Sequence, residues 1–368
     1  MLTLSACSRP EPALTPAEEL TARLQAVAGD GKILYGHQDD LSYGHTWRVE
    51  DWESDDLTRS DVRDVCGRYP AVLGFDLGGI EQADSCNLDG VPFGLIRKAA
   101  LTHAARGGIV TFSWHIRNPF TGGDAWDVSS TETVASVLEG GEKHALFMEW
   151  LGRAADFLAS LEDETGRPVP VVFRPWHEHT GSWFWWGKRL CTVAEYTALW
   201  RMTHDYLVTE RGLQHLVWAY SPGGGIDRTE YMERYPGDAY ADVLGTDVYQ
   251  YSSEGESWES SNRRYMEQVG FALDFMEELG REHGKPVALT ETGLEGIPYP
   301  EWWTDVLLPA LGTHPVCYVL TWRNAWDRET HFYGPFKGAA CEEDFRKFAR
   351  DGRIRLLSDA ETFSDLEK

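Results

Sequence analysis

The sequence predicts a (β/α)8 barrel, and three observations support this prediction. Eight short apolar runs recur along the 368 residues, each about as long as a buried strand. The segments between them are long enough for helices, and strands that alternate with helices form a parallel sheet. Most of the runs end in polar or aromatic side chains, at the strand ends where such barrels place their active sites.

The predicted elements follow one another in regular order. The strands are expected at residues 32–36, 71–77, 109–115, 171–177, 216–221, 243–249, 287–291 and 317–323. Apolar side chains recur at helical spacing in the segments 15–28, 144–161, 193–210 and 262–283. The first of these helices precedes the first strand, and the other three separate later strands.

Polar groups gather at the ends of the predicted strands. They are His37, Gln38, Asp39, Asp40, Asp76, Trp114, His115, His177, Glu178, Tyr220, Ser221, Asp247, Tyr249, Glu291, Trp322, Arg323 and Asn324. An open doubly wound sheet is the alternative fold, but it would normally carry a glycine-rich ligand-binding turn early in the chain. The glycines at 78–79 and 107–108 do not fit that pattern, and those at 223–225 come late. The barrel is therefore favoured.

The first residues differ in character from the rest of the chain. The sequence Leu-Ser-Ala-Cys that ends at Cys7 resembles the lipidation site of bacterial lipoproteins, although the apolar run before it is short for a signal peptide. We expect residues 1–18 to be a truncated leader and linker, and residues 19–368 to be one barrel domain. The intact protein is then exported, either as a periplasmic or cell-surface lipoprotein anchored at Cys7 or as a secreted protein. A chance match at Cys7 is the alternative.

Charge and cysteine content exclude several classes of partner. The 59 acidic and 34 basic residues give a net charge of -25, which would repel nucleic acids and anionic membranes but not a neutral polysaccharide. The five cysteines after Cys7 have no metal-binding spacing, so no zinc site is expected. One or two disulfides could form among these cysteines, and the sequence does not assign them. Cys66 and Cys86 are the pair closest in sequence.

The fourth predicted strand leads into the most unusual segment, residues 173–186, which holds two histidines, one glutamate and four tryptophans. Among these rings the Glu178 carboxyl group should be partly desolvated, which raises its pKa. A raised pKa suits a general acid near neutral pH, and aromatic faces suit the flat C–H surfaces of sugar rings. The alternative is a core strand with packing aromatics, but core strands rarely end in such a polar cluster.

A second isolated carboxylate, Glu291, ends the seventh run. Strands four and seven lie nearly opposite in an eight-stranded barrel, so Glu178 and Glu291 can both reach one central cleft. Glycoside hydrolysis needs such a pair, because one carboxyl group protonates the leaving oxygen while the other attacks the sugar or activates water. A structural or helix-capping acid is the alternative for Glu291 alone. The pair predicts a glycoside hydrolase.

Motifs along nearly the whole chain resemble one family. The sequence is similar to glycoside hydrolase family 26, mostly β-mannanases, among the retaining (β/α)8 hydrolases with glutamates on strands four and seven. The similar segments are 35–39, 69–76, 109–115, 174–186, 218–222, 247–249, 289–293 and 320–324. Most families of that group carry Asn before the acid/base glutamate, whereas His177 stands there in this chain, as is typical of family 26.

The resemblance implies roles for nine side chains. Glu178 would be the acid/base and Glu291 the nucleophile. Tyr249 would donate its hydroxyl to the nucleophile and hold it ionised, since hydrogen bonds to a carboxylate favour its charged form. The other six would bind the sugar: His115 and His177 at the −1 subsite, Trp183 at −1 or +1, Trp322 beneath the −1 ring, Arg323 at the same strand end, and Trp126 on the glycone side.

Several alternatives accompany this interpretation. His37, His115, His177 and His179 could form a metal site, but they lie on three strands and only the last two are close in sequence. No metal or other cofactor is therefore expected. A barrel that binds carbohydrate without cleaving it is an alternative from another class, although it would not need both glutamates.

The resemblance implies a retaining hydrolase that cleaves β-1,4-mannosidic bonds in mannan, galactomannan or glucomannan. We expect a monomer. This specificity comes from the resemblance alone, and relatives that act on β-1,3/1,4-glucans or xylans are the alternative. The choice between endo attack and release of mannobiose from chain ends depends on how the loops at 42–59, 78–92 and 118–141 wall off the glycone side. That choice stays open.

Overall fold

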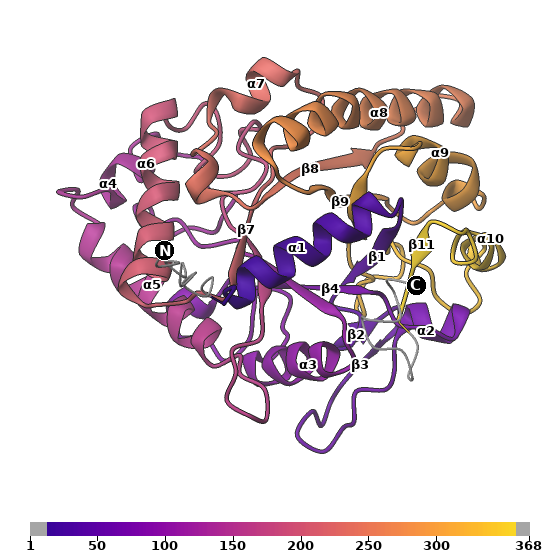
Figure 1. The fold of residues 1–368 in the computed structure, drawn as a ribbon, viewed down its shortest axis with the longest axis horizontal. Helices are drawn as coiled ribbons and strands as arrows, with labels where there is room; N and C mark the ends of the chain where they lie inside the picture. The colour runs from indigo at the N-terminus through magenta and orange to yellow at the C-terminus, as the bar shows by residue number, and fades with distance from the viewer. Residues whose placement is uncertain (1–12, 358–368) are drawn as a thin grey trace, which may run out of the picture.

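The protein forms a closed barrel of eight parallel strands, seen in a computed structural model that describes residues 13–357 (Figure 1). The expected lipidation site at Cys7 lies outside the described residues. All eight predicted strands are present. They are β1 (Ile33–Gln38), β4 (Val72–Asp76), β5 (Ile109–Ser113), β6 (Val171–Arg174), β7 (Leu216–Tyr220), β8 (Val243–Gln250), β9 (Val287–Leu294) and β10 (Val316–Thr321). Each strand pairs with the next in this order, and β10 pairs with β1 to close the barrel.

Helices surround the barrel. The longer ones are α1 (Pro16–Gly29), α3 (Phe93–Ala105), α5 (His144–Ala159), α6 (Val193–His204) and α8 (Trp258–His283). The shorter ones are α2 (Asp61–Cys66), α4 (Thr133–Val137), α7 (Arg228–Glu233), α9 (Leu308–Leu311) and α10 (Glu342–Phe348). Single 3-10 or π turns complete the set at η1 (Ile80–Gln82), η2 (Asp205–Glu210), η3 (Asp238–Tyr240) and η4 (Trp303–Leu307). The four helices predicted from sequence are all confirmed.

Local sequence explains where the first helix begins. Thr15 caps α1 by accepting from the backbone of Glu18, whose side chain accepts in return from the backbone of Thr15. This reciprocal cap satisfies two backbone donors that a helix start leaves unpaired, and Pro16 has no backbone donor to satisfy. The helix therefore begins inside the segment that we expected to be linker.

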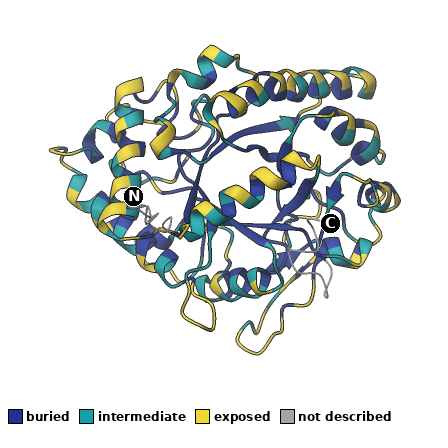
Figure 2. Cartoon of the chain, in the orientation of Figure 1, coloured by how far each residue is buried: buried dark blue, intermediate teal, exposed yellow. Residues whose placement is uncertain are grey.

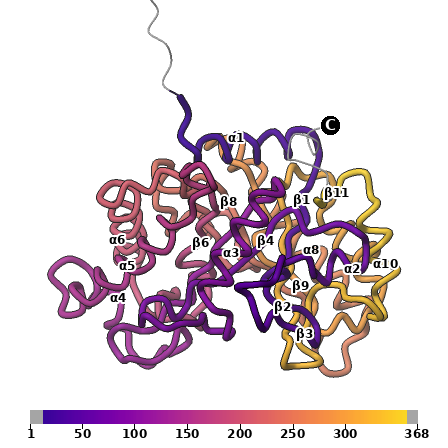
Figure 3. Tube along the Cα trace, turned by 90° about the horizontal axis from the view of Figure 1, so that it is seen from below, coloured from indigo at the N-terminus to yellow at the C-terminus, as the bar shows by residue number. Residues whose placement is uncertain are grey.

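The two ends of the barrel are built differently. Helix α1 packs against β7 and β10 and so covers the end where the strands begin. At the opposite end lies the hairpin of β2 (Tyr43–Gly44) and β3 (Trp47–Arg48), which follows β1 (Figure 3). A last short strand, β11 (Ile354–Arg355), pairs with the start of β1. The strands are buried almost throughout (Figure 2). Because α1 covers the end where the strands begin, the opposite end is left for a site.

The register of two neighbouring strands positions that site. Strands β8 and β9 pair from Leu244 and Val287 onward, with one shift between Thr246 and Asp247. After the shift Asp247 lies opposite Glu291. The irregularity therefore sets two carboxyl groups side by side near the carboxyl ends of their strands.

Two further findings concern the described residues only. Between residues 13 and 357 no helix combines the length and apolar character that crossing a membrane requires. All five cysteines in this part of the chain are free, Cys66 and Cys86 included.

Candidate active site

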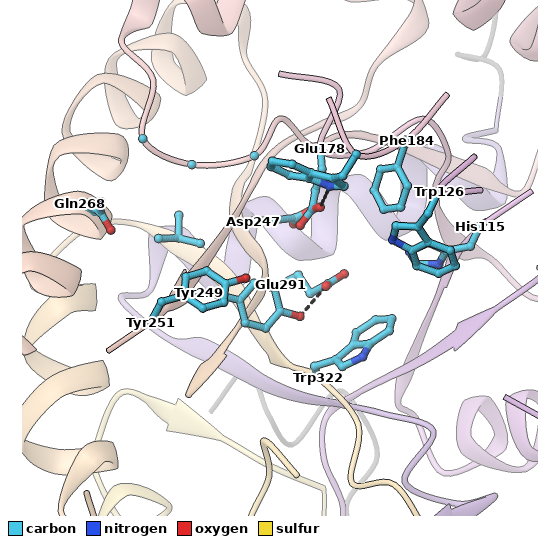
Figure 4. A pocket seen from close by; sticks show the side chains of 15 residues that line it. His115, Trp126, Glu178, Phe184, Asp247, Tyr249, Tyr251, Gln268, Glu291 and Trp322 are labelled. Atoms are coloured by element: carbon cyan, nitrogen blue, oxygen red, sulfur yellow. Dashed lines mark hydrogen bonds between the residues drawn. The ribbon is translucent and has the colours of Figure 1, made fainter. Parts of the chain in front are cut away.

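A cavity of about 620 Å³ opens at the carboxyl ends of the barrel strands (Figure 4). Both predicted catalytic glutamates face into it, together with a ring of aromatic side chains. Its lining consists of His115, Trp126, Glu178, Trp183, Phe184, Gly223, Gly224, Gly225, Asp247, Val248, Tyr249, Tyr251, Gln268, Glu291 and Trp322. The arrangement is a polar centre between aromatic walls, which suits a sugar chain.

Glu178 does not lie on a strand. Strand β6 ends at Arg174, three residues earlier than the predicted end at residue 177, and Glu178 lies on the turn that follows. The indole of Trp183 donates to Glu178 Oε2 at 2.6 Å. Burial, together with the nearby carboxylates of Asp247 and Glu291, raises the pKa of Glu178 well above its usual value. A carboxyl group in these surroundings holds its proton near neutral pH, as a general acid must.

Glu291 has the opposite surroundings. It lies on β9, is only 6% exposed, and accepts a hydrogen bond of 2.5 Å from the hydroxyl of Tyr249 on β8. The guanidinium of Arg174 donates to the other carboxylate oxygen. The two donors thus hold both oxygens of the carboxylate in place. The geometry therefore contains the predicted contact from Tyr249 and adds an arginine that we did not predict.

The same arginine ties the nucleophile candidate to a third acid. Arg174 donates to Asp247 Oδ2 at 2.6 Å, and Asp247 Oδ1 accepts from the hydroxyls of Ser221 at 2.8 Å and Thr290 at 2.7 Å. Burial and the neighbouring Glu291 raise the pKa of Asp247, against the effect of Arg174. Arg174 thus holds two carboxyl groups at once.

The two predicted −1 histidines lie at different depths. His115 lines the cavity, and its Nδ1 lies 2.7 Å from Asp76 Oδ2. Burial lowers the pKa of the imidazole, but the charge and hydrogen bond of Asp76, together with the charge of Glu291, raise it overall. His177 is 1% exposed and is not among the residues that line the cavity. Its Nε2 lies 3.3 Å from that of His115, and burial with the charges of Arg174 and His115 lowers its pKa. His177 therefore lies buried behind His115 and contacts it, and of the two only His115 reaches the cavity surface.

The predicted aromatic residues form the walls. Trp126 stacks on His115 with ring centroids 5.1 Å apart and planes 14° from parallel, while Trp322 meets His115 at 67°. Trp126 and Trp183 are 46% and 47% exposed, so their faces are open to a ligand. All three tryptophans line the cavity.

Arg323 lies in an adjoining hollow of about 460 Å³. It pairs with Asp89 at 2.8 Å and donates to the hydroxyl of Tyr43 at 3.3 Å. This hollow shares His115, Trp126 and Trp322 with the main cavity and continues to Leu88, Asp327, Arg328 and His331. The structure therefore separates Arg323 from the two glutamates, although the two hollows are continuous.

Sequence analysis placed Asp247 at a strand end and Arg174 in a segment similar to family 26 but gave neither a role in the site, and it did not name Tyr251 or Gln268. Arg174 and Asp247 could have been recognised from the sequence, because a charged residue inside an otherwise apolar buried strand needs a partner of opposite charge. Tyr251 and Gln268 could not, since an exposed tyrosine after a strand and a glutamine on a helix are ordinary surface residues.

The histidines considered as metal ligands have other partners. His37 Nδ1 lies 2.8 Å from Asp40, and His179 lies between the hydroxyls of Tyr196 and Tyr220. Across residues 13–357, no three side chains of His, Cys, Asp or Glu are grouped so that they could hold a metal ion.

Comparison with known proteins links this geometry to one family. The model of glycosyl hydrolase family 26 matches residues 11–278. A structure of a family 26 β-mannanase from Bacteroides ovatus is 48% identical in sequence, with a TM-score of 0.87 over 96% of this chain and 98% of that chain. A modular endo-β-1,4-mannanase from Cellulomonas fimi is 32% identical, with a TM-score of 0.82 over 97% of this chain and 80% of that chain.

The chain spans only part of the length of the curated relatives that it matches. A mannan endo-1,4-β-mannosidase from Bifidobacterium adolescentis is 32% identical over 359 residues, which cover 92% of this chain and 35% of the relative. The enzyme of the same name from Bacillus subtilis is 33% identical over 51% of this chain and 52% of its own length. The chain thus matches about a third of the first relative and about half of the second.

Proposed function

Because this chain belongs to glycosyl hydrolase family 26, we propose that it is a retaining β-mannanase that hydrolyses β-1,4-mannosidic bonds. One observation carries the proposal: a single cavity holds two glutamates with opposite surroundings. Glu178 has a raised pKa, whereas Glu291 accepts from Arg174 and Tyr249. Double displacement needs one protonated and one ionised carboxyl group at the scissile bond.

Each carboxyl group has a defined part in the reaction. Glu291 attacks the anomeric carbon while Glu178 transfers its proton to the departing glycosidic oxygen, so the mannosyl unit becomes an ester of Glu291. Glu178, now a carboxylate, removes a proton from water, and the resulting oxygen attacks the anomeric carbon and releases Glu291. The product keeps the β configuration, and both carboxyl groups return to their starting protonation states.

The walls of the cavity provide the binding surface for a neutral polysaccharide. Trp126, Trp183 and Trp322 present aromatic faces, and His115 presents a polar edge between them. The names of the similar enzymes support mannan as the substrate and attack within the chain as the mode of cleavage. The hollow around Arg323 continues the groove on the side of Trp126 and Trp322, where the sugars on one side of the bond would lie.

Substrate panels and product stereochemistry test the proposal. We expect reducing ends to appear from mannan and glucomannan much faster than from xylan or mixed-linkage β-glucan. Proton NMR of the first turnover should show the β-anomer before mutarotation. An α-anomer would contradict the retaining mechanism, faster cleavage of xylan or β-glucan would contradict the substrate, and tight mannan binding without cleavage would favour the non-catalytic alternative. Products from mannohexaose distinguish random cleavage from release of mannobiose.

A further inference from the structure

The turn that carries Glu178 has an unfavourable backbone conformation. Trp176 and Glu178 have φ angles of 54° and 52°, in the left-handed region that bulky side chains rarely adopt. Such residues persist where surrounding contacts over-determine the conformation, and they are frequent at functional sites. The contacts that hold this turn therefore determine where the Glu178 carboxyl group lies.

Two buried side chains hold the carbonyl groups of the turn. The hydroxyl of Tyr196, on α6, donates to the carbonyl oxygen of Trp176 at 2.8 Å. The indole of Trp186 donates to the carbonyl oxygen of His177 at 2.8 Å. Consecutive carbonyl groups immediately before Glu178 are thus each fixed by a side-chain donor from outside the turn.

The backbone of Glu178 itself is fixed at both ends. Its N–H donates to the carbonyl oxygen of Ser221 at 2.8 Å, just after β7, and its carbonyl oxygen accepts from the N–H of Gly181 at 2.9 Å. Of all these contacts, only those of Tyr196 and Trp186 come from side chains, so they can be removed by substitution without altering the chain.

Neither Tyr196 nor Trp186 can touch a substrate. Both side chains are fully buried, and neither is among the residues that line the cavity. The Tyr196 hydroxyl is fixed from a second side, because His179 Nδ1 lies 2.8 Å from it. Any effect of these residues on the reaction must pass through the turn.

We propose that Tyr196 and Trp186 are positioning residues for the acid/base, which hold the turn at residues 176–178 so that the Glu178 carboxyl group faces the glycosidic oxygen. This inference rests on the proposed function, since it takes Glu178 as the acid/base. General acid catalysis depends on geometry, and a displacement of about 1 Å costs about 100-fold in rate. Loss of either donor relaxes the turn and weakens proton transfer.

The test is Tyr196→Phe, which removes one hydroxyl and keeps the ring. We expect kcat/KM for mannotetraose, whose leaving group needs a proton, to fall about 10- to 100-fold. For 2,4-dinitrophenyl β-mannobioside, whose leaving group departs without a proton, kcat/KM should stay within about 2-fold. Hydrolysis of the mannosyl-enzyme still needs Glu178 as a base, so kcat on the dinitrophenyl substrate should fall. Azide needs no base, so it should restore this kcat and yield mannobiosyl azide.

Tyr231→Phe is the matched control. Tyr231 is also fully buried and donates at 2.9 Å to a backbone carbonyl that is not part of the turn, that of Gly245 on β8. Tyr231→Phe should lower the melting temperature by an amount similar to that of Tyr196→Phe, while kcat/KM for mannotetraose and for the dinitrophenyl substrate stays within about 2-fold. Trp186→Phe, which removes the second donor, should reproduce the leaving-group difference and stands in if Tyr196→Phe does not fold.

Three outcomes decide the inference. An equal loss on both substrates in the Tyr196 and Trp186 variants, or no loss beyond that of Tyr231→Phe, overturns it. A loss of kcat/KM confined to mannotetraose, with a kcat on the dinitrophenyl substrate that azide restores, supports it. Glu178→Ala separates this inference from the proposed function, because that variant must show the leaving-group difference if Glu178 is the acid/base, whatever the Tyr196 variant does.

Discussion

Glu178 and Glu291 face the same cavity, but the protein holds them in different ways. Glu291 lies on strand β9, next to the register shift against β8, and its carboxylate is held by charged and hydroxyl donors, Arg174 and Tyr249. Glu178 lies on a strained turn whose backbone is held, while its carboxyl group has a single side-chain donor, the half-exposed Trp183. One glutamate is fixed at its carboxylate and the other at its backbone.

This difference matches what each group must do. A nucleophile stays ionised, so donors directed at its oxygens both position it and favour its charge. An acid/base must gain and lose a proton in each cycle, and strong donors at its oxygens would hold it ionised. Holding Glu178 through its backbone positions the group and leaves its pKa free to be raised by burial. Variants at these contacts test the comparison directly.

The largest effect is expected at the nucleophile. Glu291→Ala removes the attacking oxygen, so activity on mannan and on dinitrophenyl mannobioside should fall on the order of 10⁴-fold or more. Steady-state rates measure this loss of activity, and circular dichroism checks that the variant is folded. Glu254→Ala, at an exposed glutamate, is the control and should behave as the unmodified protein. Substantial activity on either substrate would assign the nucleophile elsewhere.

A smaller effect is expected at the hydroxyl that holds the nucleophile. Tyr249→Phe removes the hydroxyl that donates to Glu291 Oε1, so the rate at the pH optimum should fall about 10- to 100-fold because the carboxylate is held less well. The alkaline limb of the pH–rate profile, which follows loss of the proton from Glu178, should stay in place. If the alkaline limb moved, the two glutamates would not be held independently.

The smallest effect is expected at the donor to the acid/base. The Trp183 indole favours the ionised form of Glu178, so Trp183→Phe should raise the pKa of Glu178 further. Glu178 then keeps its proton to higher pH, and the alkaline limb should move upward by less than about one pH unit. Trp126→Phe is the matched control, since Trp126 is equally exposed in the cavity but makes no bond to Glu178. A downward shift, or an equal shift in the control, would contradict the role of Trp183.

The amino-acid sequence by itself determined the barrel and its two glutamates. Apolar runs of strand length alternate with helical patterns, and polarity changes abruptly at the strand ends. The strands, and the end of the barrel that carries the active site, can therefore both be recognised from local sequence. Glu178 and Glu291 stand out because each is an isolated carboxylate that follows or ends such a run. Their neighbours Trp126, Trp183 and Trp322 were found from the resemblance to family 26, and the structure places all three on the cavity.

Only the tertiary structure decided which groups hold these residues. Arg174 lies 73 residues from Asp247 and 117 from Glu291, and it reaches both because of the register of β8 and β9, which no local pattern encodes. The end of β6 at Arg174 and the left-handed turn after it likewise depend on donors from α6 and the loop beyond. His177 is buried for the same reason, because packing from several strands, not its own sequence position, sets its depth.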